Sequence, residues 1–354
     1  MKLKTLILVP TALVMFSFFL NSCQSPEVTS AKVYFQQNNL DAAEEQLLIA
    51  LQKEPSNPEV PFLLATGVYI PKKEWIKARD QLLKVKEINP NYKNPMTRTD
   101  ADEQLKRLWG EIHTQGANKF NDALKEIFPA EKDSLLKEAT QKFELAIDIK
   151  GTEIITYNGL VKCYFLLDDS VNVIKWAETL MDKKLFDEDV YTYYAQILWA
   201  QNEKDKTIET LNNILSENPE AMKLQELRVQ YLAQLERLDE AKEIAQKLTR
   251  ENPDNIDLIY LLAQMHLITG DFESAQYEFN KVLIENPDDI EILTRIAEAA
   301  FQAQDWLSTE DYARRIVELD PEFAYGYTLL WKSLYNQGKK DEAEQYRQIE
   351  KSLR

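Results

Sequence analysis

Glycine and histidine are scarce in this chain of 354 residues, which contains only 8 Gly and 2 His. It has neither a G-x-G-x-x-G pattern nor a P-loop, so it offers no glycine-rich loop for a dinucleotide or a phosphate, and the shortage also argues against an all-β sandwich. The two histidines, His113 and His266, leave little material for a His-based metal site or a catalytic triad. We therefore expect no cofactor and no metal.

Positive charge is in deficit, since 42 Lys and Arg residues face 59 Asp and Glu residues and give a formal net charge of −17. Nucleic acid and anionic lipid headgroups both favour basic patches, so neither is an expected partner. Paired carboxylates such as Asp168–Asp169 and Asp288–Asp289 fall in expected turns between helices, where acidic caps are their ordinary explanation. No catalytic constellation remains, and we predict that the chain is not an enzyme.

Only two cysteines are present, and the first, Cys23, closes an N-terminal segment typical of an export signal. Lys2 and Lys4 precede an apolar run over residues 6–20, which is shorter than a usual transmembrane span and is followed by small and polar residues. The alternative is a single N-terminal membrane helix. The second cysteine, Cys163, has no intramolecular disulfide partner in the mature chain, and we expect it to be buried and inert rather than redox-active.

The four residues that end this segment, Leu-Asn-Ser-Cys at 20–23, resemble the lipobox of bacterial lipoproteins. The resemblance implies that residues 1–22 are removed as a signal peptide and that Cys23 carries acyl chains, palmitate among them. Residues 23–30 would then form a lipidated tether. No second apolar run follows, so the acyl chains would be the only membrane attachment, and several chains together hold firmly. Removal of the signal peptide takes the net charge from −17 to −19.

The remainder of the chain repeats one unit about nine times. Pro219, Pro253, Pro287 and Pro321 are each separated by 34 residues, and small side chains recur at two fixed positions between them. Each unit has two amphipathic segments with helical spacing, and the second ends before its proline. A helix–turn–helix unit with this period is similar to the tetratricopeptide repeat (TPR). The resemblance implies an all-α superhelical solenoid over residues 31–354.

Two units depart from the pattern. In the third, over about residues 101–150, the interval from Phe120 to Ala139 is ten residues longer than the matching interval in the next unit. This predicts an elongated hairpin that turns near Pro129 and protrudes by roughly 7 Å, either as harmless decoration or as a docking knob. In the final helix, Arg347 and Glu350 replace apolar residues, which predicts a solvated terminal cap.

In TPR proteins the first helix of each pair lines a concave groove that binds extended peptides or helices, and the resemblance implies such a groove here. Glutamines 34 residues apart would form a ladder of amides in it, or would simply occupy wet helical positions. Its aromatic residues would anchor a partner, or would pack between repeats. The Lys-then-Asn clamp of TPR proteins that grip a C-terminal carboxylate is missing. The predicted groove residues are Asn158, Lys162, Phe165, Gln196, Trp199, Gln230, Tyr260, Gln264, Phe301 and Tyr335.

Together these features predict a lipid-anchored scaffold of a bacterial envelope that binds protein partners through its groove. Gln24 follows the cysteine, and the absence of Asp there favours the outer membrane by analogy with enteric lipoproteins. A more specific hypothesis is an accessory role in outer-membrane protein or pilus assembly. The alternative is a glycan- or solute-binding surface lipoprotein, which the near-complete use of the chain by repeats disfavours.

Overall fold

A computed structural model describes residues 25–354, so the signal segment and Cys23 lie outside the described residues. Within the described range all regular secondary structure is helical, and the chain divides between Val190 and Tyr191 into two compact units. The first unit holds α1 (Pro26–Gln36), α2 (Leu40–Lys53), α3 (Glu59–Leu63) with its π-helical continuation η1 (Leu64–Tyr69), α4 (Trp75–Ile88), α5 (Ala101–Lys125), α6 (Pro129–Ile149), α7 (Ile154–Leu166) and α8 (Ser170–Asp182).

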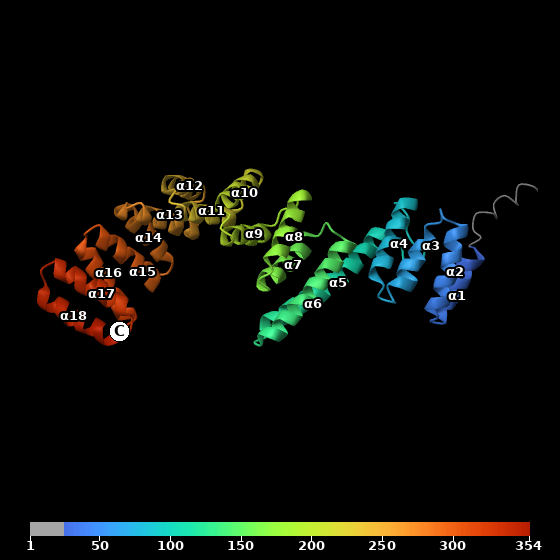
Figure 1. Ribbon diagram of the computed structural model, residues 1–354, viewed down its shortest axis with the longest axis horizontal. Coiled ribbons are helices and arrows are strands. Elements are labelled where there is room, and N and C mark those ends of the chain that lie inside the picture. The colour runs from blue at the N-terminus through green and yellow to red at the C-terminus, as the bar shows by residue number, and fades with distance from the viewer. Residues whose placement is uncertain (1–24) are drawn as a thin grey trace, which may run out of the picture. The chain divides into compact units, whose positions relative to one another are not determined.

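Helix α9 (Glu188–Ala200) begins in the first unit and continues into the second. The helices of the second unit are α10 (Lys204–Glu217), α11 (Met222–Gln234), α12 (Leu238–Glu251), α13 (Ile256–Ile268), α14 (Phe272–Glu285), α15 (Ile290–Gln302), α16 (Trp306–Leu319), α17 (Ala324–Asn336) and α18 (Lys340–Leu353). Taken in order, with α3 and η1 as one arm, the described helices form nine hairpins (Figure 1). The predicted all-α repeat fold is confirmed.

Helix boundaries follow the local signals. The second helices α10, α12, α14 and α16 each end two residues before a proline, because the residue that precedes proline avoids α geometry. Asp169 and Asp289 accept hydrogen bonds from backbone N–H groups in the first turns of α8 and α15. The acidic pairs therefore include helix N-caps, as the sequence predicted.

In every described hairpin except the third, the turn places one residue in the left-handed backbone region. From the fourth hairpin on, this residue recurs every 34 positions, and only Gly270 and Gly338 are glycines. The remaining positions of that series carry an L side chain at a φ of 55° to 64°, and they are Asp168, Asn202, Glu236 and Gln304. Most of these turns therefore form without glycine, and this explains how a chain with only 8 Gly can contain so many tight turns.

Small side chains lie where the two helices of a hairpin approach each other. They include Ala195, Ala263 and Ala297 on first helices and Ala241 and Ala275 on second helices, all with 0% exposure. Larger apolar residues of successive hairpins pack beside them, in one cluster over α1–α6 and another over α13–α18. Close packing of this kind explains why only small residues recur at these positions.

The third hairpin is the longest, with 25 residues in α5 and 21 in α6, and it stands out in Figure 1. Its turn lies over residues 126–128, and Pro129 occupies the first position of α6. Gly116 of α5 lies directly against the ring of Phe143 of α6. Ile127 and Phe128 at the tip are exposed.

Three details differ from, or add to, the sequence analysis. Helix α1 begins at Pro26, inside the predicted tether, because Ser25 caps it and proline is well suited to a first helical position. Glu350 is not solvated: its side chain faces inward and pairs with Arg354. Cys163 is fully buried, and burial raises the pKa of its thiol to about 12.

No helix in the described part of the chain has the length and apolar character needed to cross a membrane.

Candidate functional site

Two hydrogen bonds join the first helices of successive hairpins in the second unit. The Tyr260 hydroxyl of α13 donates to Glu291 Oε1 of α15 at 3.2 Å, and the Tyr325 hydroxyl of α17 donates to Glu298 Oε1 of α15 at 3.0 Å. Gln264 lies one turn after Tyr260 on the same side of α13. We call the surface formed by these five residues the first-helix face.

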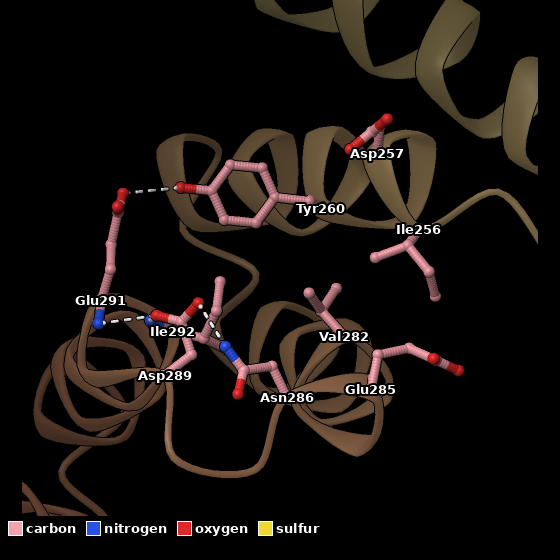
Figure 2. Close-up of a pocket in the computed structure, with 9 residues that line it drawn as sticks. All are labelled: Ile256, Asp257, Tyr260, Val282, Glu285, Asn286, Asp289, Glu291 and Ile292. Atoms are coloured by element: carbon pink, nitrogen blue, oxygen red, sulfur yellow. Dashed lines mark hydrogen bonds between the residues drawn. The ribbon is translucent and has the colours of Figure 1, made fainter.

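Two cavities open on the first-helix face. The first has a volume of about 360 Å³ and lies among α13, α14 and α15 (Figure 2). The second has a volume of about 310 Å³ and is its equivalent one repeat later, with Ile290 in place of Ile256 and Phe323 in place of Asp289. Glu291 lines both cavities. The repeat therefore presents the same kind of opening twice, with different chemistry in each.

Four of the nine residues that line the first cavity are apolar or aromatic and form its inner walls. Val282 of α14 and Ile292 of α15 are buried, and Ile256 and Tyr260 face them from α13 (Figure 2). The Tyr260 ring packs edge-on against Phe279, with 5.6 Å between the ring centroids. This contact and the hydrogen bond to Glu291 hold the tyrosine in place at the cavity.

Four carboxylates surround these walls, and the lining contains no Lys or Arg. Asp289 accepts hydrogen bonds from the backbone N–H groups of Glu291 and Ile292 at 2.9 and 3.1 Å, and Glu291 accepts the Tyr260 hydroxyl. Asp257 and Glu285 are exposed, and neither carboxylate has a hydrogen-bond or ion-pair partner among residues 25–354. The rim of the first cavity is therefore negatively charged. Arg295 reaches it at Tyr260, with whose side chain it interacts, and leaves Asp257 and Glu285 without an ion-pair partner in the described chain.

The second cavity carries its own cation. Arg295 Nη1 lies 3.2 Å from Glu298 Oε2, so the carboxylate that accepts the Tyr325 hydroxyl is already paired. Burial and the nearby Glu298 raise the pKa of Tyr325 to about 12, so its hydroxyl stays a hydrogen-bond donor at neutral pH. Phe323 and Ile290 supply the apolar lining.

Two predicted groove residues of the first unit are engaged within the chain. Asn158 donates to both carboxylate oxygens of Asp187 at 2.9 and 3.1 Å. Lys162 pairs with Asp189 Oδ2 at 3.0 Å. These contacts join α7 to the segment that begins α9. Phe165, on the same helix, is half-buried.

The predicted aromatic groove residues contact other side chains of their own unit. Trp199 stacks on Tyr231 of the next first helix, with centroids 4.0 Å apart and planes 1° from parallel. Phe301 packs edge-on against Trp306 at 5.3 Å. Tyr335 is more than half exposed, and the ammonium of Lys340 lies 5.7 Å from its ring centroid.

The three glutamines lie on the first helices α9, α11 and α13, all within the second unit. Gln230 is exposed, whereas Gln196 and Gln264 are half-buried. Across the residues that the structure describes, none of the three side chains makes a hydrogen bond. Their amides thus keep both donors and acceptor capacity for solvent or for a partner.

The histidines belong to separate local networks. His113 stacks on Trp109 and contacts the Thr156 hydroxyl, and burial lowers its pKa. His266 lies 2.8 Å from Asp271. No group of three His, Cys, Asp or Glu side chains in the described range is arranged to hold a metal ion.

The acidic lining of the first cavity was not among the residues predicted from the sequence. Those residues lie at the fifth, ninth and twelfth positions of the repeat, counted with Pro219, Pro253, Pro287 and Pro321 at position 32. The available signal was the second position, which holds Asp189, Lys223, Asp257, Glu291 and Tyr325 at 34-residue spacing and is acidic in three of these five repeats. In the structure, side chains at this position meet the fifth or ninth residue of the preceding first helix, as in the pairs Lys162–Asp189 and Tyr260–Glu291.

Comparison with known families matches two tetratricopeptide repeat models, one over residues 194–256 and one over residues 232–298. No curated protein matches the chain. Among solved structures, a tetratricopeptide repeat protein from Parabacteroides merdae is 16% identical, and the match covers 69% of this chain and 93% of that chain, with a TM-score of 0.47.

Two other solved structures are similar over about half of the chain. YrrB, described as a TPR protein with an unusual peptide-binding site, is 16% identical, with 50% of this chain and 91% of that chain covered and a TM-score of 0.43. MamA from Desulfovibrio magneticus RS-1 is 14% identical, with 47% and 94% covered and a TM-score of 0.43. None of these likenesses bears on what this chain binds.

Proposed function

We propose that this chain, whose residues 194–298 match tetratricopeptide repeat models, is a scaffold that binds protein partners through its first-helix face. The observation that carries the proposal is the pair of equivalent cavities along α13, α15 and α17, beside first helices whose Gln230 and Gln264 amides make no hydrogen bond in the described chain. An extended segment laid along this face would meet apolar cavities for its side chains and amides for its backbone.

The proposal includes attachment to a bacterial outer membrane through acyl chains on Cys23. The lipobox-like Leu-Asn-Ser-Cys sequence and the preceding apolar run support this part. A scaffold held in this way would work on partners at the membrane surface. We propose, as the finer form of the function, that it is an accessory in outer-membrane protein or pilus assembly.

Site-directed photo-crosslinking in intact cells tests the binding face. Benzoylphenylalanine at Gln230 or Gln264 would crosslink the partner, whereas the same group at Glu273, exposed on the second helix α14, would not. The finer proposal requires the captured protein to be a barrel-assembly or pilus component. Equal capture from Glu273 and from the two first-helix positions would contradict the face, and capture of unrelated proteins alone would contradict the assembly role.

A further inference from the structure

We propose that the first cavity receives a lysine or arginine side chain from a basic segment of the partner. The inference rests on the proposed function, since it names the chemistry of the partner that the first-helix face binds. The occupant is an extended cationic peptide, and the features that point to it are the apolar walls of the cavity and the unpaired charge at its rim.

The walls match the stem of a long cationic side chain. Lys and Arg bury their methylene groups along apolar surface while their charged heads stay in water. Ile256, Val282, Ile292 and the ring of Tyr260 provide such a surface in a cavity of about 360 Å³. A short polar residue would leave the apolar walls exposed to water. An uncharged apolar residue would cover the walls but would not neutralise the carboxylates at the rim.

The rim supplies the charge that such a head needs. Asp257 and Glu285 stand on α13 and α14 and belong to the lining (Figure 2), and neither carboxylate has an ion-pair partner in the described chain. Asp289 and Glu291 accept hydrogen bonds only from neutral donors. A cation that enters the cavity would thus meet negative charge from three helices.

Some other carboxylates of the second unit do have cations beside them. In the second cavity Arg295 pairs with Glu298, and on α16 the carboxylate of Glu310 contacts both Arg314 and Lys339. Asp257 and Glu285, by contrast, line a cavity and have no ion-pair partner in the described chain. This difference from Glu298 and Glu310 points to a cation that arrives with a partner.

A metal ion is not the indicated occupant. The four carboxylates lie around an apolar opening, and they are not among any groups arranged to hold a metal within residues 25–354. A side chain with a long apolar stem satisfies both the walls and the rim, whereas a bare ion satisfies only the rim.

Peptide binding to the purified full chain with Cys23→Ser tests the inference. The probe is a fluorescein-labelled ten-residue peptide with two lysines among uncharged residues, and its matched controls carry acetyl-lysine or glutamate at the same two places. We expect the lysine peptide to bind at least tenfold more tightly than the acetyl-lysine peptide. The advantage should shrink as salt is raised from 50 to 500 mM, because salt screens the attraction between exposed charges. The Debye length falls from about 10 Å at 0.1 M to about 3 Å at 1 M.

Two charge-matched double variants locate the effect. Asp257→Asn with Glu285→Gln removes two rim charges, and we expect about a fivefold to tenfold loss of affinity for the lysine peptide. Asp311→Asn with Glu318→Gln removes two exposed, unpaired charges from α16, outside both cavities, and should change affinity less than about twofold, as expected of distant exposed charges. All four side chains are exposed, so both variants should keep the thermal unfolding midpoint of the parent.

Equal binding of the lysine and acetyl-lysine peptides would overturn the inference, and so would equal losses in the two double variants, which would reveal a diffuse effect of net charge. These failures differ from failure of the proposed function. If photo-crosslinks from Gln264 persist while the lysine preference is absent, the first-helix face stands and its basic partner does not. Loss of both results would remove the face as well.

Discussion

Trp199 stacks on Tyr231, with 4.0 Å between ring centroids and 1° between ring planes. The two residues come from successive first helices, and Tyr231 is buried. The stack therefore joins one repeat to the next inside the second unit. Trp199 therefore has a role in stabilising the fold that does not depend on contact with a partner.

Replacing Trp199 should weaken the second unit. Trp199→Ala removes the stack, which is worth about 0.5–1.5 kcal/mol beyond the area it buries, and we expect a total loss of about 2 kcal/mol in the free energy of unfolding. Trp199→Phe keeps an aromatic ring over Tyr231 and should lose less than about 1 kcal/mol. Urea unfolding measures both changes. Unchanged stability of Trp199→Ala, together with loss of the partner, would instead identify the ring as a groove anchor.

Two glycines of α5 should respond in opposite ways to alanine. A Cβ at Gly116 would lie 2.9 Å from the Phe143 ring, whereas a Cβ at Gly110 would have nothing within 4 Å. Gly116→Ala should therefore destabilise the chain by about 1–2 kcal/mol, because overpacking outweighs the gain in helix propensity. Gly110→Ala should stabilise it by about 0.5–1 kcal/mol. Thermal unfolding of the two variants compares them, and a shift in the same direction would contradict the packing of α5 on α6.

Asp271 should contribute stability that disappears in acid. Burial would raise the pKa of its carboxyl, but hydrogen bonds from Ser274, His266 and Lys242 outweigh burial and lower the pKa from its ordinary 3.8 to about 2. Because the folded-state pKa is the lower one, the stabilisation is complete above about pH 4 and is lost as the pH falls toward 2. The side chain is 39% exposed, so solvent screening limits the contribution to about 1 kcal/mol.

Asp271→Asn is the matching variant, since asparagine can still cap α14 while carrying no charge. It should be about 1 kcal/mol less stable than the parent at pH 7, and the difference should vanish near pH 2. Urea unfolding at several pH values follows it. A difference that stays constant between pH 7 and pH 2 would show that the carboxylate charge is not the cause.

Cys23→Ala should release the protein from the membrane. The proposed attachment depends on acyl chains at this residue, and the described part of the chain has no helix that could span a bilayer. Without acylation, fractionation should recover the chain among soluble envelope proteins, with a circular dichroism spectrum of unchanged helical character. Continued sedimentation with the membranes would contradict the lipid anchor.

Much of the fold could be predicted from the sequence because its determinants are local. The 34-residue period, the prolines after α10, α12, α14 and α16, and the acidic caps at Asp169 and Asp289 each act within a few residues of the backbone that they shape. The small residues of the hairpins report the closest approach of two helices directly, since no larger side chain is accommodated there.

The candidate site followed less directly. Position counting selected Tyr260 and Gln264, and the structure places both on the first-helix face. It also selected Asn158 and Lys162, whose polar groups are engaged by Asp187 and Asp189 about thirty residues further along. Such partners depend on how one hairpin packs on the next, and no pattern within a single helix carries that information.

The sequence by itself determined that this chain is a series of helical hairpins with a 34-residue period, and that the second helices α10, α12, α14 and α16 end before their prolines. Only the tertiary structure decided which charged side chains have an ion-pair partner and which do not. Glu298 has Arg295 beside it, Asp257 and Glu285 of the first cavity have no ion-pair partner in the described chain, and Glu350 turns inward to meet Arg354. The physical reason is that helix formation depends on neighbours in the chain, whereas ion pairing and cavity shape depend on the docking of one repeat against another.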